Sequence, residues 1–73
     1  MGLHDDLKQQ HAGLSRTLQK ASAVIIRGLA DIPFQSIRDL ATLTDVSPLS
    51  IIRLTRKWGF SGYPAFQTAV RAD

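Results

Sequence analysis

The sequence contains no cysteine among its 73 residues. Disulfide bonds and cysteine-ligated metal sites are therefore excluded, and the composition fits a reducing cytoplasm. Long apolar runs are also missing, since the longest, Ala23–Ile26, is far too short to span a bilayer. The opening stretch MGLHDDLKQQ carries acids where a signal peptide needs a basic segment followed by an apolar one. We therefore expect a soluble, cytoplasmic protein without a membrane partner.

Glutamate is absent as well, so aspartate supplies every acidic side chain. The formal net charge is +3 and the sequence pI is near 10.0. Between Val46 and Val70 the charged residues are all basic, namely Arg53, Arg56 and Lys57. A locally positive segment attracts polyanions, so nucleic acid is a candidate partner.

An alternation of apolar and polar residues, the pattern of a strand, persists nowhere beyond a few positions. Glycine and proline instead divide the chain into helix-sized segments. These segments are residues 3–10, 14–33, 36–44 and 48–58, and a last one opened by Pro64. The second is closed by Pro33, and Gly28 weakens its last turn. Because 73 residues hold one domain, we predict an all-α bundle of about five short helices over residues 1–73.

Several of these segments begin with residues that cap helices. Ser15 and Ser36 each precede a helical pattern, and Asp39 stands where it nearly completes a capping box with Ser36. Ser47 followed by Pro48 is a third start signal, because proline at the first helical position needs no amide donor. The sequence therefore predicts three well-defined helix starts.

Residues 36–59 are a helix-turn-helix candidate, with two helices, Ser36–Thr44 and Pro48–Trp58, joined by a tight turn. Ala41 is small enough to let the two backbones approach where they cross. The shared apolar wedge consists of Leu40, Val46, Ile51 and Leu54. Asp45 holds the turn position that needs a left-handed backbone, which aspartate tolerates better than most residues. Gly59 supplies a left-handed residue after the second helix.

The second helix of this candidate has two faces at about 100° per residue. The inward face is Ile51, Leu54, Thr55 and Trp58. The outer face is Pro48, Leu49, Ile52, Arg53 and Arg56, with Lys57 at its edge. Arginine can pair with guanine or grip phosphate, and aliphatic side chains can pack on thymine methyl groups. The amides at the helix start near Ser47 can bind a phosphate. The outer face therefore predicts binding in a DNA major groove.

Two other interpretations of this face exist. A basic helix face is often simply solvated, and single exposed aliphatic residues are normal on monomers. Found together on the second helix of a capped helix-turn-helix, the two features favour DNA. The alternative function is a protein-docking or dimerisation surface, with Leu49 and Ile52 as its anchors.

The remaining reactive side chains form no recognisable catalytic or metal site. His4 and His11 lack a third ligand and are interpreted as surface histidines. Asp5 and Asp6 are adjacent, and neighbouring residues on a helix point apart. No serine has a histidine or lysine partner at a recognisable spacing, and no glycine-rich phosphate loop is present. We predict no enzyme activity, no cofactor and no metal.

Residues 36–70, SIRDLATLTDVSPLSIIRLTRKWGFSGYPAFQTAV, resemble the N-terminal domain of RpiR-type bacterial transcriptional regulators. The family pattern reads approximately S-I-x-x-L-A, then V-S-x-x-(T/S)-(V/I)-x-R, then a G-F-x-G-(Y/F) closure. The matching residues are Ser36, Ile37, Leu40, Ala41, Val46, Ser47, Ser50, Ile51, Arg53, Gly59, Phe60, Gly62 and Tyr63. Asp45 replaces the usual glycine, and Leu54 and Trp58 replace a more usual phenylalanine and leucine. The resemblance implies a homeodomain-like or winged-helix-superfamily helix-turn-helix without a clear wing.

Family members usually continue into a C-terminal sugar-isomerase-type (SIS) domain, which binds a phosphosugar effector and helps the protein dimerise. That domain is not among these 73 residues, so we expect them to belong to a longer regulator. The resemblance implies control of sugar or sugar-phosphate metabolism genes by a homodimer on an inverted-repeat operator. The two recognition helices would then lie about 34 Å apart.

The resemblance also implies roles for individual positions. Ser47 and Ser50 would contact phosphate, and Arg38 on the first helix would clamp the DNA backbone. The residues facing base edges or groove walls would be Leu49, Ile52, Arg53 and Arg56.

Overall fold

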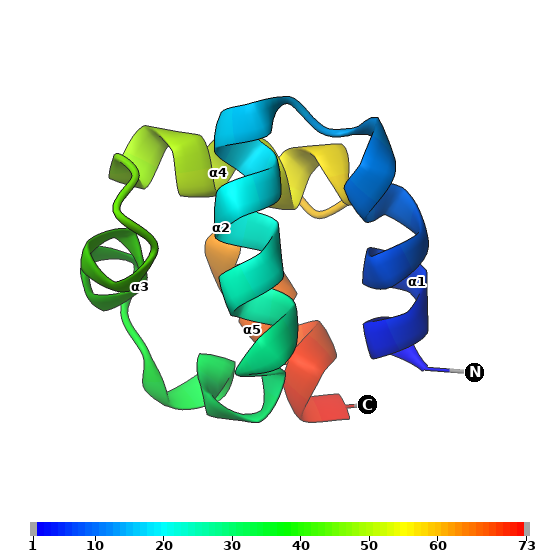
Figure 1. Ribbon diagram of the computed structural model, residues 1–73. Helices are drawn as coiled ribbons and strands as arrows, with labels where there is room; N and C mark the ends of the chain where they lie inside the picture. Colours follow the sequence, from blue (N-terminus) through cyan, green and yellow to red (C-terminus); the bar gives the residue numbers. More distant parts are fainter. Residues whose placement is uncertain (1, 73) are drawn as a thin grey trace.

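Residues 2–72, which the computed structural model describes, form five α-helices and two short 3₁₀-helices joined by short turns and loops (Figure 1). In chain order they are α1 (Leu3–Gln10), η1 (His11–Gly13), α2 (Arg16–Arg27), η2 (Leu29–Phe34), α3 (Ile37–Thr44), α4 (Pro48–Lys57) and α5 (Tyr63–Ala72). This part of the chain contains no strand, so the predicted all-α class is confirmed. The ends of the predicted domain, Met1 and Asp73, lie outside the described residues. No described helix is both long and apolar enough to cross a membrane.

The predicted helix starts are confirmed by their hydrogen bonds. The Ser15 hydroxyl accepts from the amide of Leu18, at the start of α2. At α3 the Ser36 hydroxyl accepts from the Asp39 amide at 3.0 Å, and the Asp39 carboxylate accepts from the Ser36 amide at 3.2 Å. This reciprocal pair is a complete capping box and satisfies two amides that have no partner within the helix.

The second predicted helix ends earlier than its apolar spacing indicates. α2 stops at Arg27, Gly28 is its C-cap, and the chain continues as η2 rather than as the same helix. Glycine destabilises a helix interior, and Pro33 has no amide to donate to a further turn. Pro33 therefore lies inside η2 and does not close α2, which corrects the predicted boundary.

α2 is the central helix of the bundle. It packs against α1, α3 and α4, and Figure 1 shows α1 and α3 on opposite sides of it. α5 packs against η2 and α4. The buried apolar side chains are Leu7, Leu18, Ala21, Ile25, Ile32, Leu40, Ala41, Ile51, Leu54, Trp58, Tyr63 and Phe66. Because every α-helix contributes to this one core, the position of α4 depends on the whole bundle.

The turn between α3 and α4 has the predicted left-handed residue. Asp45 has φ 58° and ψ 39°, and its amide donates to the carbonyls of Ala41 and Thr42 at the end of α3. The amide of Val46 also donates to the Ala41 carbonyl, at 3.2 Å. These bonds satisfy carbonyls at the helix end and set the direction in which α4 departs.

The start of α5 is tied to the segment before α3 through two side chains. The Tyr63 hydroxyl donates to the Gln35 carbonyl at 2.8 Å, and Gln67 Nε2 donates to the same oxygen at 2.8 Å. Both side chains also donate to the Ile32 carbonyl, at 3.4 and 3.2 Å. Burial of the phenol raises the pKa of Tyr63 above its usual value of 10.0.

This raised pKa predicts a loss of stability in alkali that depends on Tyr63. The Tyr63 phenol ionises less readily in the folded state than in the unfolded state. Its contribution to the free energy of unfolding is therefore complete below pH 10.0 and is lost as the pH rises through the folded-state pKa. At neutral pH we expect Tyr63→Phe to lower the free energy of unfolding by about 0.5–1.5 kcal/mol, for the lost hydrogen bonds. Above pH 10.0 the two proteins should converge, as measured by urea unfolding across this range. A constant difference at all pH values would contradict the assignment.

Candidate nucleic-acid interface

α4 has the two faces that its sequence predicts. Ile51, Leu54 and Thr55 are fully buried, and Trp58 at the helix end is buried as well. The Thr55 hydroxyl donates to the carbonyl of Ile52 at 2.9 Å, which satisfies a polar group inside the core. The inward face is therefore confirmed, and the opposite face of α4 is the one available to a partner.

The outer face of α4 is open along most of its length. Leu49 is 54% exposed, Ile52 is half-buried, and Arg53 and Arg56 are exposed. Within the described residues, the side chain of Arg53 has no hydrogen bond and no ion pair. Its guanidinium, with five N–H donors in a fixed fork, is thus free for an acceptor outside the protein.

A hollow of about 450 Å³ lies at the N-terminal end of this face. It is lined by Arg38, Ala41, Thr42, Asp45, Val46, Ser47 and Pro48. The hydroxyl of Ser47 accepts from the amide of Ser50 at 3.2 Å, and Pro48 has no amide proton. Leu49 therefore provides the open amide of this first turn, and exposed Arg38 lines the hollow together with Ser47 and Pro48. A helix start with a nearby cation suits a phosphate.

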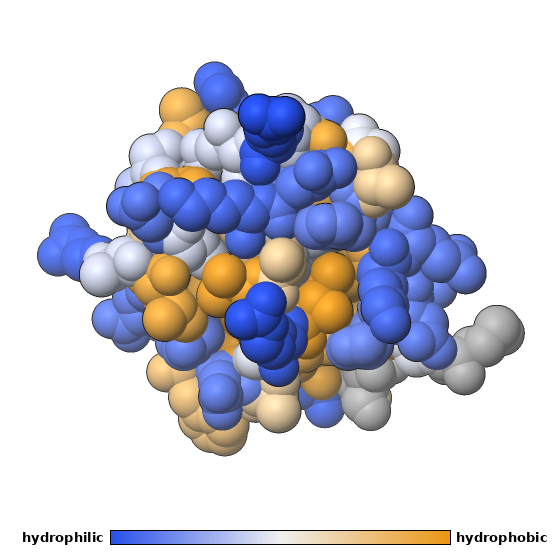
Figure 2. All heavy atoms as spheres, in the orientation of Figure 1, coloured by the Kyte–Doolittle hydropathy of each residue, from blue (hydrophilic) through white to orange (hydrophobic). Residues whose placement is uncertain are grey.

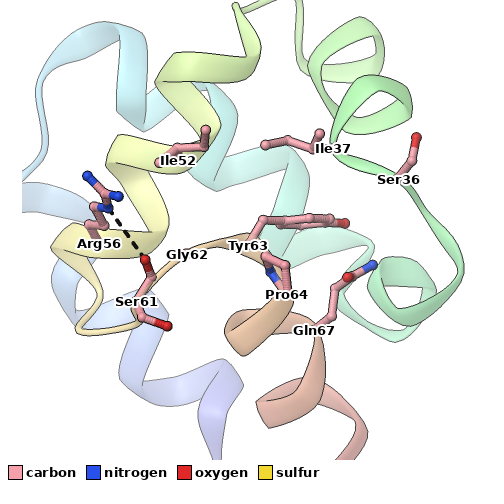
Figure 3. A pocket seen from close by; sticks show the side chains of 9 residues that line it. All are labelled: Ser36, Ile37, Ile52, Arg56, Ser61, Gly62, Tyr63, Pro64 and Gln67. Atoms are coloured by element: carbon pink, nitrogen blue, oxygen red, sulfur yellow. Dashed lines mark hydrogen bonds between the residues drawn. The ribbon is translucent and has the colours of Figure 1, made fainter.

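A second hollow, of about 410 Å³, lies beside the C-terminal half of the outer face. Ile37 of α3 and Ile52 of α4 point toward each other above the Tyr63 ring, as Figure 3 shows. Arg56 extends to the edge of this hollow, where its Nε donates to the Ser61 carbonyl at 3.4 Å. Arg56 is thus turned toward the start of α5, whereas Arg53 has no such tether.

All nine residues predicted to contact DNA belong to the helix-turn-helix unit. Eight of them are the α4 cap and helix residues Ser47, Pro48, Leu49, Ser50, Ile52, Arg53, Arg56 and Lys57, and the ninth is Arg38 of α3. Lys57 is exposed at the last position of α4. Ser50 is half-buried, and its hydroxyl lies 3.1 Å from that of Ser47, so these two hydroxyls form one polar unit at the helix start.

Several polar contacts were not predicted from the sequence, among them two that involve side chains of α2. Lys20 of α2 forms an ion pair with Asp45, the residue at the turn, with 3.2 Å between Nζ and Oδ2. His11 is half-buried rather than a surface histidine, because its Nδ1 lies 3.0 Å from the hydroxyl of fully buried Ser22. Each pair joins segments that only the folded chain brings together, so no local sequence signal reveals it. Among the described residues, no group of three potential metal ligands lies close together.

The capped second helix, its buried inner face and its arginine-bearing outer face are the parts of a DNA-binding helix-turn-helix domain. The sequence pattern of the helix-turn-helix domain, rpiR family, matches residues 1–73, and the chain belongs to that family. No protein with curated annotation matches the sequence. Among solved structures, the NanR protein of Vibrio vulnificus, complexed with ManNAc-6P, is similar at 32% identity and a TM-score of 0.94. The match covers 99% of this chain and 27% of the NanR chain, so the 73 residues span about a quarter of that protein.

Proposed function

We propose that this domain binds double-stranded DNA in a sequence-specific manner by inserting the outer face of α4, the helix predicted as residues 48–58, into the major groove. The observation that carries the proposal is the outer face of α4, where an untethered arginine stands beside an exposed leucine. Arg53 would read guanine through its forked donors, and Leu49 and Ile52 would pack on thymine methyl groups. This combination suits a groove floor, which presents acceptors and methyl groups side by side.

The hollows on either side of the outer face would hold the sugar-phosphate backbone. At the start of α4, Arg38, the Ser47–Ser50 hydroxyls and the open Leu49 amide would contact one phosphate. At the other end Arg56, held by the Ser61 carbonyl, would contact the opposite wall of the groove, with Lys57 nearby. The tether supports assigning Arg56 to phosphate rather than to bases.

The proposal for the whole regulator extends beyond this domain. We infer that it works as a homodimer on an inverted repeat, with recognition helices about 34 Å apart, in the cytoplasm where bacterial DNA lies. An additional C-terminal SIS domain would bind a phosphosugar and help the protein dimerise. The similarity to NanR in complex with ManNAc-6P supports genes of sugar or sugar-phosphate metabolism as the targets. Nothing in the proposal requires a catalytic residue or a cofactor.

A salt titration tests the proposed function directly. Binding of the chain to a labelled duplex of mixed sequence is measured by fluorescence anisotropy while salt rises from about 50 to 200 mM. Two to four phosphate contacts predict a loss of affinity of about ten- to a hundredfold, because each neutralised phosphate releases a counterion. Arg53 and Arg56 changed together to alanine should remove most of the binding.

The alternative function makes the opposite prediction. If α4 docks on a protein or on a second copy, Leu49→Ser or Ile52→Ser would abolish association, and the arginine substitutions would matter little. A flat salt titration together with that pattern would favour the docking surface over DNA.

A further inference from the structure

An ion pair joins α2 to the turn of the helix-turn-helix. Lys20 Nζ lies 3.2 Å from Asp45 Oδ2, and the two side chains are 58% and 89% exposed. Ion pairs this open contribute little to folding, since solvent screens them and two long side chains must be held still. Stabilisation of the fold is therefore a weak explanation for the Lys20–Asp45 ion pair.

Asp45 stands at an unfavourable place for an acid. Its left-handed backbone, at φ 58°, suits glycine or asparagine better. It follows the C-terminal end of α3, where the helix dipole repels a negative charge. Its side chain also lines the same hollow as Arg38 and Ser47, the proposed contacts of a DNA phosphate. A carboxylate there repels the incoming phosphate.

Lys20 is the one described cation that forms an ion pair with this carboxylate. Arg38 shares the hollow but is not paired with Asp45. The charged residues that line the hollow are therefore Arg38 and Asp45, and Lys20 is ion-paired with the second of them. With the pair intact, the lysine offsets part of the negative charge of Asp45, and Arg38 is the cation of the hollow that has no ion-pair partner.

We propose that Lys20 is a positioning residue for DNA binding, which acts by neutralising Asp45 beside the phosphate contact. The inference rests on the proposed DNA-binding function and adds to it a residue outside the helix-turn-helix unit. Lys20 raises the affinity for DNA because it weakens the repulsion between the Asp45 carboxylate and the DNA phosphate. Its effect therefore depends on the presence of Asp45. Asp45 in turn keeps the affinity below the value that this fold can reach.

A double-mutant cycle tests the coupling on the 73-residue chain with a labelled mixed-sequence duplex at low salt. Asp45→Asn keeps the side-chain size and the left-handed backbone but removes the charge, so binding should tighten about two- to fivefold. Lys20→Met should weaken binding of the unaltered chain by a similar factor. In the Asp45→Asn background Lys20→Met should have little effect, because no repulsion is left to suppress.

Lys8→Met is the matched control, since it removes one exposed lysine from α1, on the side of α2 away from α3 (Figure 1). It should change affinity less than Lys20→Met does. Thermal unfolding should place all these variants close to the unaltered chain. Figure 2 shows an apolar area in the middle of this face, where α2 lies in Figure 1, with polar side chains above it.

Three results would overturn the inference. The first is an equal loss from Lys20→Met in both backgrounds, which would mean that the lysine contacts phosphate itself. The second is no gain from Asp45→Asn. The third is a loss of folding by Lys20→Met that accounts for its loss of binding. If the folded, unaltered chain fails to bind the duplex at all, the proposed function is wrong, and this inference is wrong with it.

Discussion

Arg53→Ala is expected to weaken binding to the operator by about 1–3 kcal/mol and to leave thermal stability unchanged. The side chain is exposed and makes no hydrogen bond or ion pair within the described residues, so the fold loses nothing when it is removed. Its open guanidinium would pair with two acceptors of one guanine, and alanine leaves those acceptors unpaired. The operator can be selected from a random duplex pool with the 73-residue chain, and affinity measured by anisotropy.

Arg56→Ala is the matched control for this prediction. The two arginines belong to the same helix face, but Arg56 is tethered to the Ser61 carbonyl and turned toward the start of α5. Its loss should weaken operator and unrelated duplex alike and lower the salt slope by about 1. Arg53→Ala should instead reduce the preference for the operator. Equal losses on both duplexes from Arg53→Ala would show that the arginine grips phosphate, and the base-reading role would be wrong.

The local signals in the sequence account for much of the fold. A serine hydroxyl caps the amides of its own helix, so Ser15, Ser36 and Ser47 mark helix starts without any tertiary information. Asp45 is similar, because its left-handed backbone depends on the turn itself. The buried face of α4 also follows from helical spacing alone, since residues one turn apart share a side.

Other features required the folded chain. Leu7 is fully buried although its segment is polar apart from Leu3, so one pair of apolar residues four apart was a weak signal for a buried face. Tyr63 reaches carbonyls about thirty residues earlier, and Lys20 reaches a turn residue 25 positions later. These partners depend on how α2 and α5 pack in the bundle. Helical periodicity describes only residues within one helix and cannot predict them. The candidate site could be proposed from the sequence because its outer face belongs to one helix. The Lys20–Asp45 ion pair could not, because it joins two separate elements.

Among truncations to alanine of fully buried side chains, Phe66→Ala is expected to have the largest effect on the stability of this domain. Phe66 is fully buried, and its ring centroid lies 5.3, 5.4 and 6.3 Å from those of Trp58, Phe60 and Tyr63. Truncating such a side chain costs about 3–5 kcal/mol, through lost burial and the cavity left behind. A domain of 73 residues has about 4–11 kcal/mol in total, so much of its stability would be lost. Urea unfolding followed by tryptophan fluorescence measures the change.

Phe34→Ala supplies a control with the same chemical change at the surface. Phe34 is 86% exposed, and its truncation should alter stability by no more than about 0.5 kcal/mol.

The difference between Phe66→Ala and Phe34→Ala also bears on DNA binding. The aromatic rings packed around Phe66 join the end of α4 to the start of α5, close to the carbonyl that holds Arg56. At a temperature where Phe66→Ala is partly unfolded, it should lose duplex binding in proportion to its unfolded fraction, while Phe34→Ala binds normally. If Phe66→Ala stays folded yet cannot bind, the aromatic cluster would instead orient the α4 surface without stabilising the domain.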